Sequence, residues 1–279
     1  MARPCWIAIS DFLLVISIRG AERMLVIRSA QMKAFEDAAQ LRFENEMVAH
    51  SKKFSPRLCE VLGDEQLRVA VRGAMGRAAV YGFTYRGPIR LFIEMMFLRG
   101  TAFDTDPQYH VVGRILRGPG DQMVRAQQIH EEWLEYLEQV SGPGAAHVHG
   151  ALKDISVFVQ QPISYSAENL TAEMLRDMTR LFPQKVAYVG EEALTALIQE
   201  GREAARQHGF ASPRAAALVV TLMFAFGHGC TDDPLYPWIA RTLADEKILD
   251  SNARAARLER KAITWLEHVV ARNERRATT

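Results

Sequence analysis

The feature that most constrains the fold of this chain is an internal repeat. Residues 81–116 align without gaps with residues 208–243 at an offset of 127, and 11 of the 36 pairs are identical. A recurring segment of this kind is the sequence signature of a repeated supersecondary unit. We therefore predict a tandem duplication of a unit of about 100 residues, with two pseudo-equivalent helical bundles packed together.

Both copies read as helices separated by prolines and glycines, which predicts an all-α fold. Strong helix formers dominate residues 30–52, Pro56 interrupts them, and Asp64 is a candidate N-cap for the next helix. The prolines and glycines that follow are typical of helix starts and ends. We expect helices over 30–52, 65–81, 88–99, 107–116 and 122–140, and in the second copy over 171–182, 191–207, 213–226, 234–243 and from 251 onward.

This pattern divides the chain into a leader, two units and a linker. We place the first unit at 24–141, the linker at 142–168 and the second unit at 169–279. The linker combines glycine and proline with a β-branched run, so we expect an extended arm or one short strand at 155–159.

Residues 1–23 are predicted to be a leader outside the folded units. Their apolar stretch from Trp6 to Ile18 is interrupted by Asp11 and is shorter than the roughly 20 residues that span a bilayer. Met24 begins a plausible protein, so the leader is interpreted as a misassigned start or a disordered segment. A packed element and a signal or membrane anchor stay as alternatives, although we do not expect a membrane role.

The charge balance excludes some classes of protein. With 34 Lys and Arg, 33 Asp and Glu and a net charge of +1, the chain is not a strongly basic nucleic-acid binder. Three cysteines are too few for a disulfide scaffold. The near-zero net charge conceals two helices of opposite charge, because residues 122–140 are acidic and the last helix is basic. We interpret them as solvated faces, as complementary surfaces within one chain or a homodimer, or as a partner surface; the basic residues are Arg254, Arg257, Arg260, Lys261, Arg272, Arg275 and Arg276.

The sharpest local motif is an acidic Asp-Pro turn after each apolar helix, FDTDPQY and CTDDPLY. Helix capping explains both residue types, since an Asp satisfies free amide groups and a Pro starts the helix. A carboxylate pair for a cation or a cationic partner group is the functional alternative. The candidate partner-binding residues are Asp104, Asp106, Tyr109, Asp232, Asp233, Tyr236 and Trp238.

No cofactor or metal site is predicted. His228, Cys230 and Asp232 resemble a metal cluster, but the first copy lacks equivalent ligands and no further Cys or His lies at zinc spacing. His147 and His149 lack a third ligand. Nucleophile-elbow, zincin and phosphate-loop motifs are absent from the sequence.

Three segments together resemble a group of uncharacterised bacterial helical proteins encoded near type VI secretion components and PAAR-type effectors. They are MLVIRSAQMKAFEDAAQLRFENEMVAH, MFLRGTAFDTDPQY and DDPLYPWIARTL. The first copy departs from the pattern at His110-Val111, where the second has Pro-Trp. The resemblance brings no catalytic residues. It implies a cytoplasmic accessory role as an immunity protein, adaptor or chaperone for a secreted effector.

The sequence therefore favours a non-enzymatic protein-interaction module with a protein partner, such as a secreted effector, and no nucleic acid. A homodimer is also considered. The alternative is a metal-dependent enzyme of unrecognised type that uses the Asp-Pro turns. We also expect Met96, Phe97, Met223 and Phe224 to be buried in equivalent positions.

Overall fold

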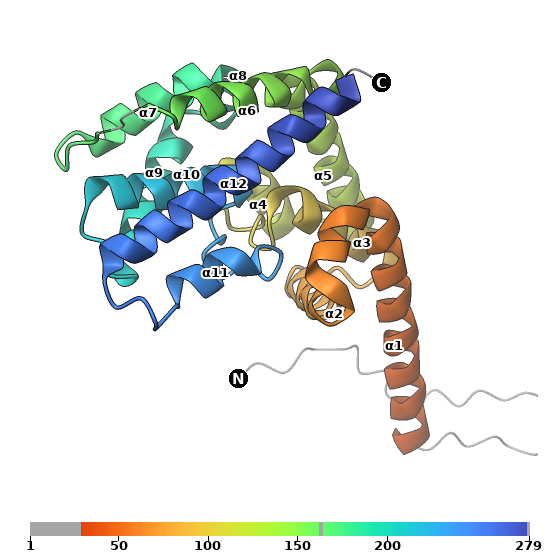
Figure 1. The fold of residues 1–279 in the computed structure, drawn as a ribbon. Helices are drawn as coiled ribbons and strands as arrows, with labels where there is room; N and C mark the ends of the chain where they lie inside the picture. Colours follow the sequence, from red (N-terminus) through yellow and green to blue (C-terminus); the bar gives the residue numbers. More distant parts are fainter. Residues whose placement is uncertain (1–28, 162–163, 278–279) are drawn as a thin grey trace, which may run out of the picture.

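The computed structural model describes residues 29–161 and 164–277 and has an all-α fold (Figure 1). Twelve α-helices and no strand occur in these residues. The predicted leader, residues 1–23, lies outside them. The α-helices are α1 (Ser29–Phe54), α2 (Pro56–Val80), α3 (Arg86–Arg99), α4 (His110–Arg117), α5 (Gln122–Tyr136), α6 (Ala146–Phe158), α7 (Leu170–Leu181), α8 (Pro183–Val189), α9 (Glu191–Gln207), α10 (Pro213–Phe226), α11 (Pro237–Leu243) and α12 (Ser251–Ala277).

The expectation of an extended arm at 155–159 was wrong. Helix α6 covers Ala146–Phe158, so most of this β-branched run is helical. Its half-buried residues pack between α7 and α12, and tertiary packing overrides a weak local preference for strand. The segment predicted as a linker therefore contributes a helix to the fold.

One predicted boundary is close and another shifted. Helix α2 spans Pro56–Val80, but the backbone at Gly63, with φ at 73° and ψ at 165°, is not helical and divides it into two helical segments. The second segment begins close to the predicted residue 65, although Gly63 and not Asp64 precedes it, and the Asp64 carboxylate pairs with Lys52 at 2.7 Å. In the second half, α11 starts at Pro237 because Pro234 lies in a turn.

The apolar residues form two cores, one in each half of the chain. Helices α1 to α5 enclose the first, and α7 to α12 enclose the second. Met96 and Phe97 of α3 and Met223 and Phe224 of α10 are buried, as predicted. Two residues of the second half cross over, because Leu235 belongs to the first core and the half-buried Tyr236 packs against both cores.

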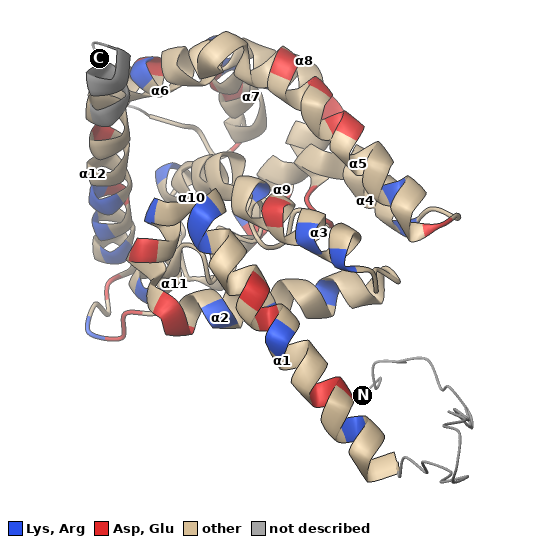
Figure 2. Cartoon of the chain, turned by 90° about the vertical axis from the view of Figure 1, so that its right-hand side faces the viewer, with Lys and Arg blue, Asp and Glu red and all other residues tan. Residues whose placement is uncertain are grey.

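The first half of α1 projects from the body of the molecule (Figures 1 and 2). Every residue of 29–42 is exposed, and burial starts at Phe43. At the other end of the chain, α12 runs across the molecule and packs on α6, α10 and α11. No helix in the described part of the chain is long and apolar enough to cross a membrane.

The acidic helix α5 and the basic helix α12 pack against different helices. Figure 2 shows Lys and Arg positions along α12. Of its predicted basic residues, Arg254 donates to the His208 carbonyl and Lys261 to Thr242, whereas the side chains of residues 272–279 lie outside the described part. Helix α5 packs on α3 and α4 and turns Glu132 into the protein.

Candidate functional site

The two Asp-Pro turns meet at the centre of the molecule, where α3 and α10 end. Gly100 follows α3 with φ at 91°, and Gly227 follows α10 with φ at 97°. A Cβ atom on Gly100 would lie 2.5 Å from the Phe226 carbonyl oxygen, and one on Gly227 would lie 2.6 Å from the Arg99 carbonyl oxygen. Both the backbone conformation and this close approach require glycine.

Each turn donates a backbone N–H to a carboxylate of the other turn. The N–H of His228 donates to Oδ2 of Asp106 at 2.7 Å, and the N–H of Thr101 donates to Oδ2 of Asp233 at 2.8 Å. Donors and acceptors in these two bonds are related by the same offset of 127 residues that relates the sequences. The two halves therefore join through a reciprocal pair of charge-assisted hydrogen bonds.

The second oxygen of each carboxylate caps its own turn. Oδ1 of Asp106 accepts from the Gln108 N–H at 2.8 Å, and Oδ1 of Asp233 accepts from the Leu235 N–H at 2.8 Å. The helix-capping interpretation is thus confirmed for Asp106, which caps the short helix Pro107–Tyr109, whereas Asp233 satisfies an amide of a turn that precedes α11. Gln108 also reaches into the other half, where its Nε2 donates to the Met223 carbonyl at 3.0 Å.

Two buried cationic side chains lie at this junction. Nζ of Lys185 donates to the Phe224 carbonyl at 2.5 Å and lies 4.1 Å from the centre of the Phe224 ring. The Arg99 guanidinium lies 2.8 Å from Glu132. Three rings enclose Arg99 at 4.5 to 5.0 Å, which gives it cation–π contacts; these rings are Tyr109, Trp133 and Tyr136.

Burial shifts the pKa values of the groups at the junction. It raises the pKa of the Asp106 carboxyl, and the N–H of His228 partly offsets this rise. The pKa of Asp233 is raised for the same reason, with the N–H of Thr101 acting against it. Burial lowers the pKa of Lys185 to about 8, against the attraction of Asp106. The junction is therefore a desolvated network whose charges depend on internal partners.

The side chains of the other predicted site residues have different partners. Asp104 is buried, accepts from Arg77 Nη2 at 2.5 Å and accepts from the Tyr81 hydroxyl at 2.8 Å. Asp232 is exposed. Tyr236 and Trp238 pack against the Phe226 ring, and Tyr109 is buried beside Arg99.

The described residues contain no group of three His, Cys, Asp or Glu side chains that could hold a metal ion. His228 turns its ring to Glu200 at 2.9 Å and to Thr105 at 3.0 Å. Cys230 is fully buried, and burial raises the pKa of its thiol.

Three functional side chains could not be found from the sequence: Arg99, Gln108 and Lys185. Arg99 ends a helix that also carries Arg86, Arg90 and Glu94, so its charge does not single it out. Gln108 and Lys185 carry no local signal either, because only the packing of the two halves brings them to the junction.

The chain was compared with family models, curated proteins and solved structures, and none of them matches it.

We expect Gly100→Ala and Gly227→Ala each to destabilise the protein by several kcal/mol, since a Cβ atom overlaps a carbonyl of the other half at a positive φ. Gly76→Ala is the matched control. Gly76 lies inside α2 with no atom within 4 Å of a Cβ, so the change should stabilise by about 0.5–1 kcal/mol. Urea unfolding measures all three, and equal effects at the three positions would contradict the close approach.

Asp106→Asn should lower the free energy of unfolding by about 1–3 kcal/mol, because an amide has one acceptor oxygen and leaves one buried N–H unpaired. The same holds for Asp233→Asn. Asp232→Asn changes an exposed carboxylate in the same turn and should stay within about 0.5 kcal/mol of the parent. Thermal unfolding compares them, and a neutral Asp106→Asn would rule out the cross-turn bonds.

Lys185 should make stability depend on pH. Its pKa is about 8 in the folded protein against 10.5 for an ordinary lysine, so between these values the unfolded chain binds more protons. Stability should therefore rise from pH 8 to pH 10, by up to about 1.4 kcal/mol per unit. Lys185→Met removes this rise. Urea unfolding of both proteins at each pH isolates the effect, and parallel curves would argue against a desolvated lysine.

Proposed function

We propose that this chain is a non-enzymatic protein-interaction protein and that α1 is its docking element. The observation that carries the proposal is the exposed first half of α1. Isolated helices shorter than about 12–15 residues are marginal in water. Residues 29–42 extend the packed part of α1 without burying a side chain, so a partner that packs on them would stabilise this half of the helix.

The two faces of α1 differ in a way that supports docking on the outer one. The buried residues Phe43 and Met47 define the face toward the body. One to three turns earlier, the same face carries Glu36, Asp37 and Gln40, which gives the projecting part a polar underside. The opposite face mixes polar side chains with exposed apolar ones, so it is available to another protein; these apolar residues are Phe35, Ala38 and Leu41.

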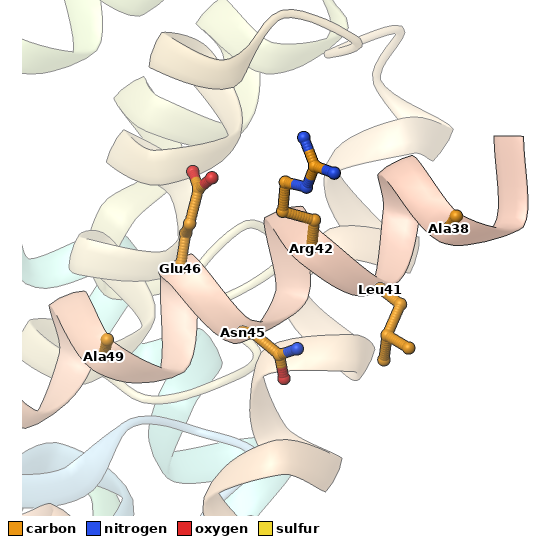
Figure 3. Close-up of a pocket in the computed structure, with 6 residues that line it drawn as sticks. All are labelled: Ala38, Leu41, Arg42, Asn45, Glu46 and Ala49. Atoms are coloured by element: carbon orange, nitrogen blue, oxygen red, sulfur yellow. The ribbon is translucent and has the colours of Figure 1, made fainter. Parts of the chain in front are cut away.

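The outer face is hollowed into a shallow groove (Figure 3). Ala38 and Ala49 form its floor, and longer side chains stand on both sides. Leu41 and Asn45 form one wall, and Arg42 and Glu46 form the other. A floor of small residues between two ridges accepts the ridge of a second helix.

The charges on the walls indicate the chemistry of the occupant. Glu46 already pairs with Arg86, and Asn45 accepts from Arg68 at 2.7 Å. Arg42 has no ion-pair partner among the described residues. We therefore propose a helix of a partner protein, with an apolar side chain for the floor and a carboxylate for Arg42.

We further propose that the chain is a tandem duplication of two equivalent helical units. Its support is the sequence repeat together with the two cross-turn bonds, whose atoms follow the same offset. In this proposal the Asp-Pro turns join the units and act on partner binding only indirectly. The metal-dependent alternative gains no support, since Asp104, Asp106 and Asp233 accept hydrogen bonds from the chain itself.

The resemblance to proteins encoded near type VI secretion genes suggests the kind of partner. We propose a cytoplasmic role as immunity protein, adaptor or chaperone, with the effector or another product of a neighbouring gene on α1.

Charge placed in the groove should abolish binding. Ala38→Glu and Ala49→Glu keep good helix formers and put a carboxylate on the groove floor, so we expect at least tenfold weaker binding. Gln40→Glu puts the same charge on the polar underside and should leave affinity unchanged. The measurement is calorimetry with co-purified products of neighbouring genes.

Absence of any such partner at micromolar affinity would contradict the proposal. Light scattering tests whether a second copy of this chain occupies the groove instead. A dimer of the parent chain that Ala38→Glu dissociates would show that it does.

A further inference from the structure

We propose that the cavity between α6, α7, α10 and α12 is a binding site for a compact, uncharged apolar molecule, of the size of a one- or two-ring aromatic compound. The cavity has a volume of about 170 Å³. It lies in the second half of the chain and shares no residue with the α1 groove. The proposal is therefore independent of the proposed protein interaction.

The walls of the cavity are apolar on all four sides. Helix α6 contributes Ile155 and Phe158, α7 contributes Met174 and Met178, and α10 and α12 supply further aliphatic and aromatic side chains. Small residues at Ala217 and Ala262 leave the space open. An enclosed apolar cavity of about 150 Å³ in another protein binds benzene. This cavity is slightly larger, which sets the size of the proposed ligand.

The polar groups at the rim are already paired, and this decides the charge of the ligand. The Tyr165 hydroxyl donates to Asp177 at 3.0 Å, and Arg214 donates to Glu259 at 2.6 Å. The Thr221 hydroxyl donates to the Ala217 carbonyl at 2.8 Å. A charged ligand would lose its hydration without gaining a free counter-ion, and the two rim carboxylates disfavour an anion most.

Helix α6 covers one side of the cavity and is only loosely buried itself. Ala151 is its one buried residue, whereas Leu152, Ile155 and Phe158 are half-buried toward the cavity. Arg180 of α7 lies 4.7 Å from the centre of the Phe158 ring and holds that end of the helix. An apolar ligand would complete the burial of this face, so binding should stabilise α6 and raise the melting temperature.

Titration calorimetry of the full chain with indole and toluene tests the proposal. We expect saturable binding at one site and a rise in melting temperature, and at least tenfold weaker binding of indole-3-carboxylate, which adds a negative charge to the same ring. Ala262→Phe fills the cavity and should weaken indole binding at least tenfold. Ala253→Phe places the same ring on an exposed position of α12 outside the cavity and should bind indole like the parent.

Ala217→Leu is a second filling variant from α10, for the case in which Ala262→Phe unfolds. Methyl NMR of Met174, Ile263 and Leu266 locates the bound molecule. No saturable binding to the parent chain, or equal binding to the parent and a folded filled variant, would overturn the site. Ala38→Glu should leave indole binding unchanged, so failure of the α1 docking surface and failure of this cavity are distinguishable.

Discussion

The crossed hydrogen bonds between the two Asp-Pro turns are the interaction on which the rest of the structure depends. A buried carboxylate is costly unless several donors satisfy it, and both Asp106 and Asp233 have donors from each half. Each carboxylate therefore depends on the other half for one of its donors. The bonds fix the ends of α3 and α10 against each other, and this contact leaves no room for a side chain at Gly100 or Gly227.

The same junction explains why the halves exchange side chains. Gln108 bonds to a carbonyl of α10, and Leu235 enters the first core. Lys185 and Arg99 place positive charge beside the buried carboxylates and Glu132, which reduces the cost of desolvation. The projecting half of α1 and the cavity under α6 lie at the periphery, and both present apolar surface that the chain itself leaves uncovered.

Particular residues show how far local sequence signals reach. Ser212 and Asp250 cap α10 and α12 through amides within three residues, which is the range over which a local sequence signal acts. Gly100 and Gly227 end their helices for an equally local reason. The expectation of an extended run at 155–159 failed, since the packing of α6 on α12 is decided by distant parts of the chain.

The sequence by itself determined the all-α class, most helix ends and the positions of the two Asp-Pro turns, because propensity and capping act within a few residues. Only the tertiary structure decided what the carboxylates do. Their partners lie more than a hundred residues away, at His228 for Asp106 and at Thr101 for Asp233, and nothing local encodes that pairing. The tertiary structure also decided which apolar surfaces stay uncovered, on α1 and under α6, since burial is a property of the packed molecule.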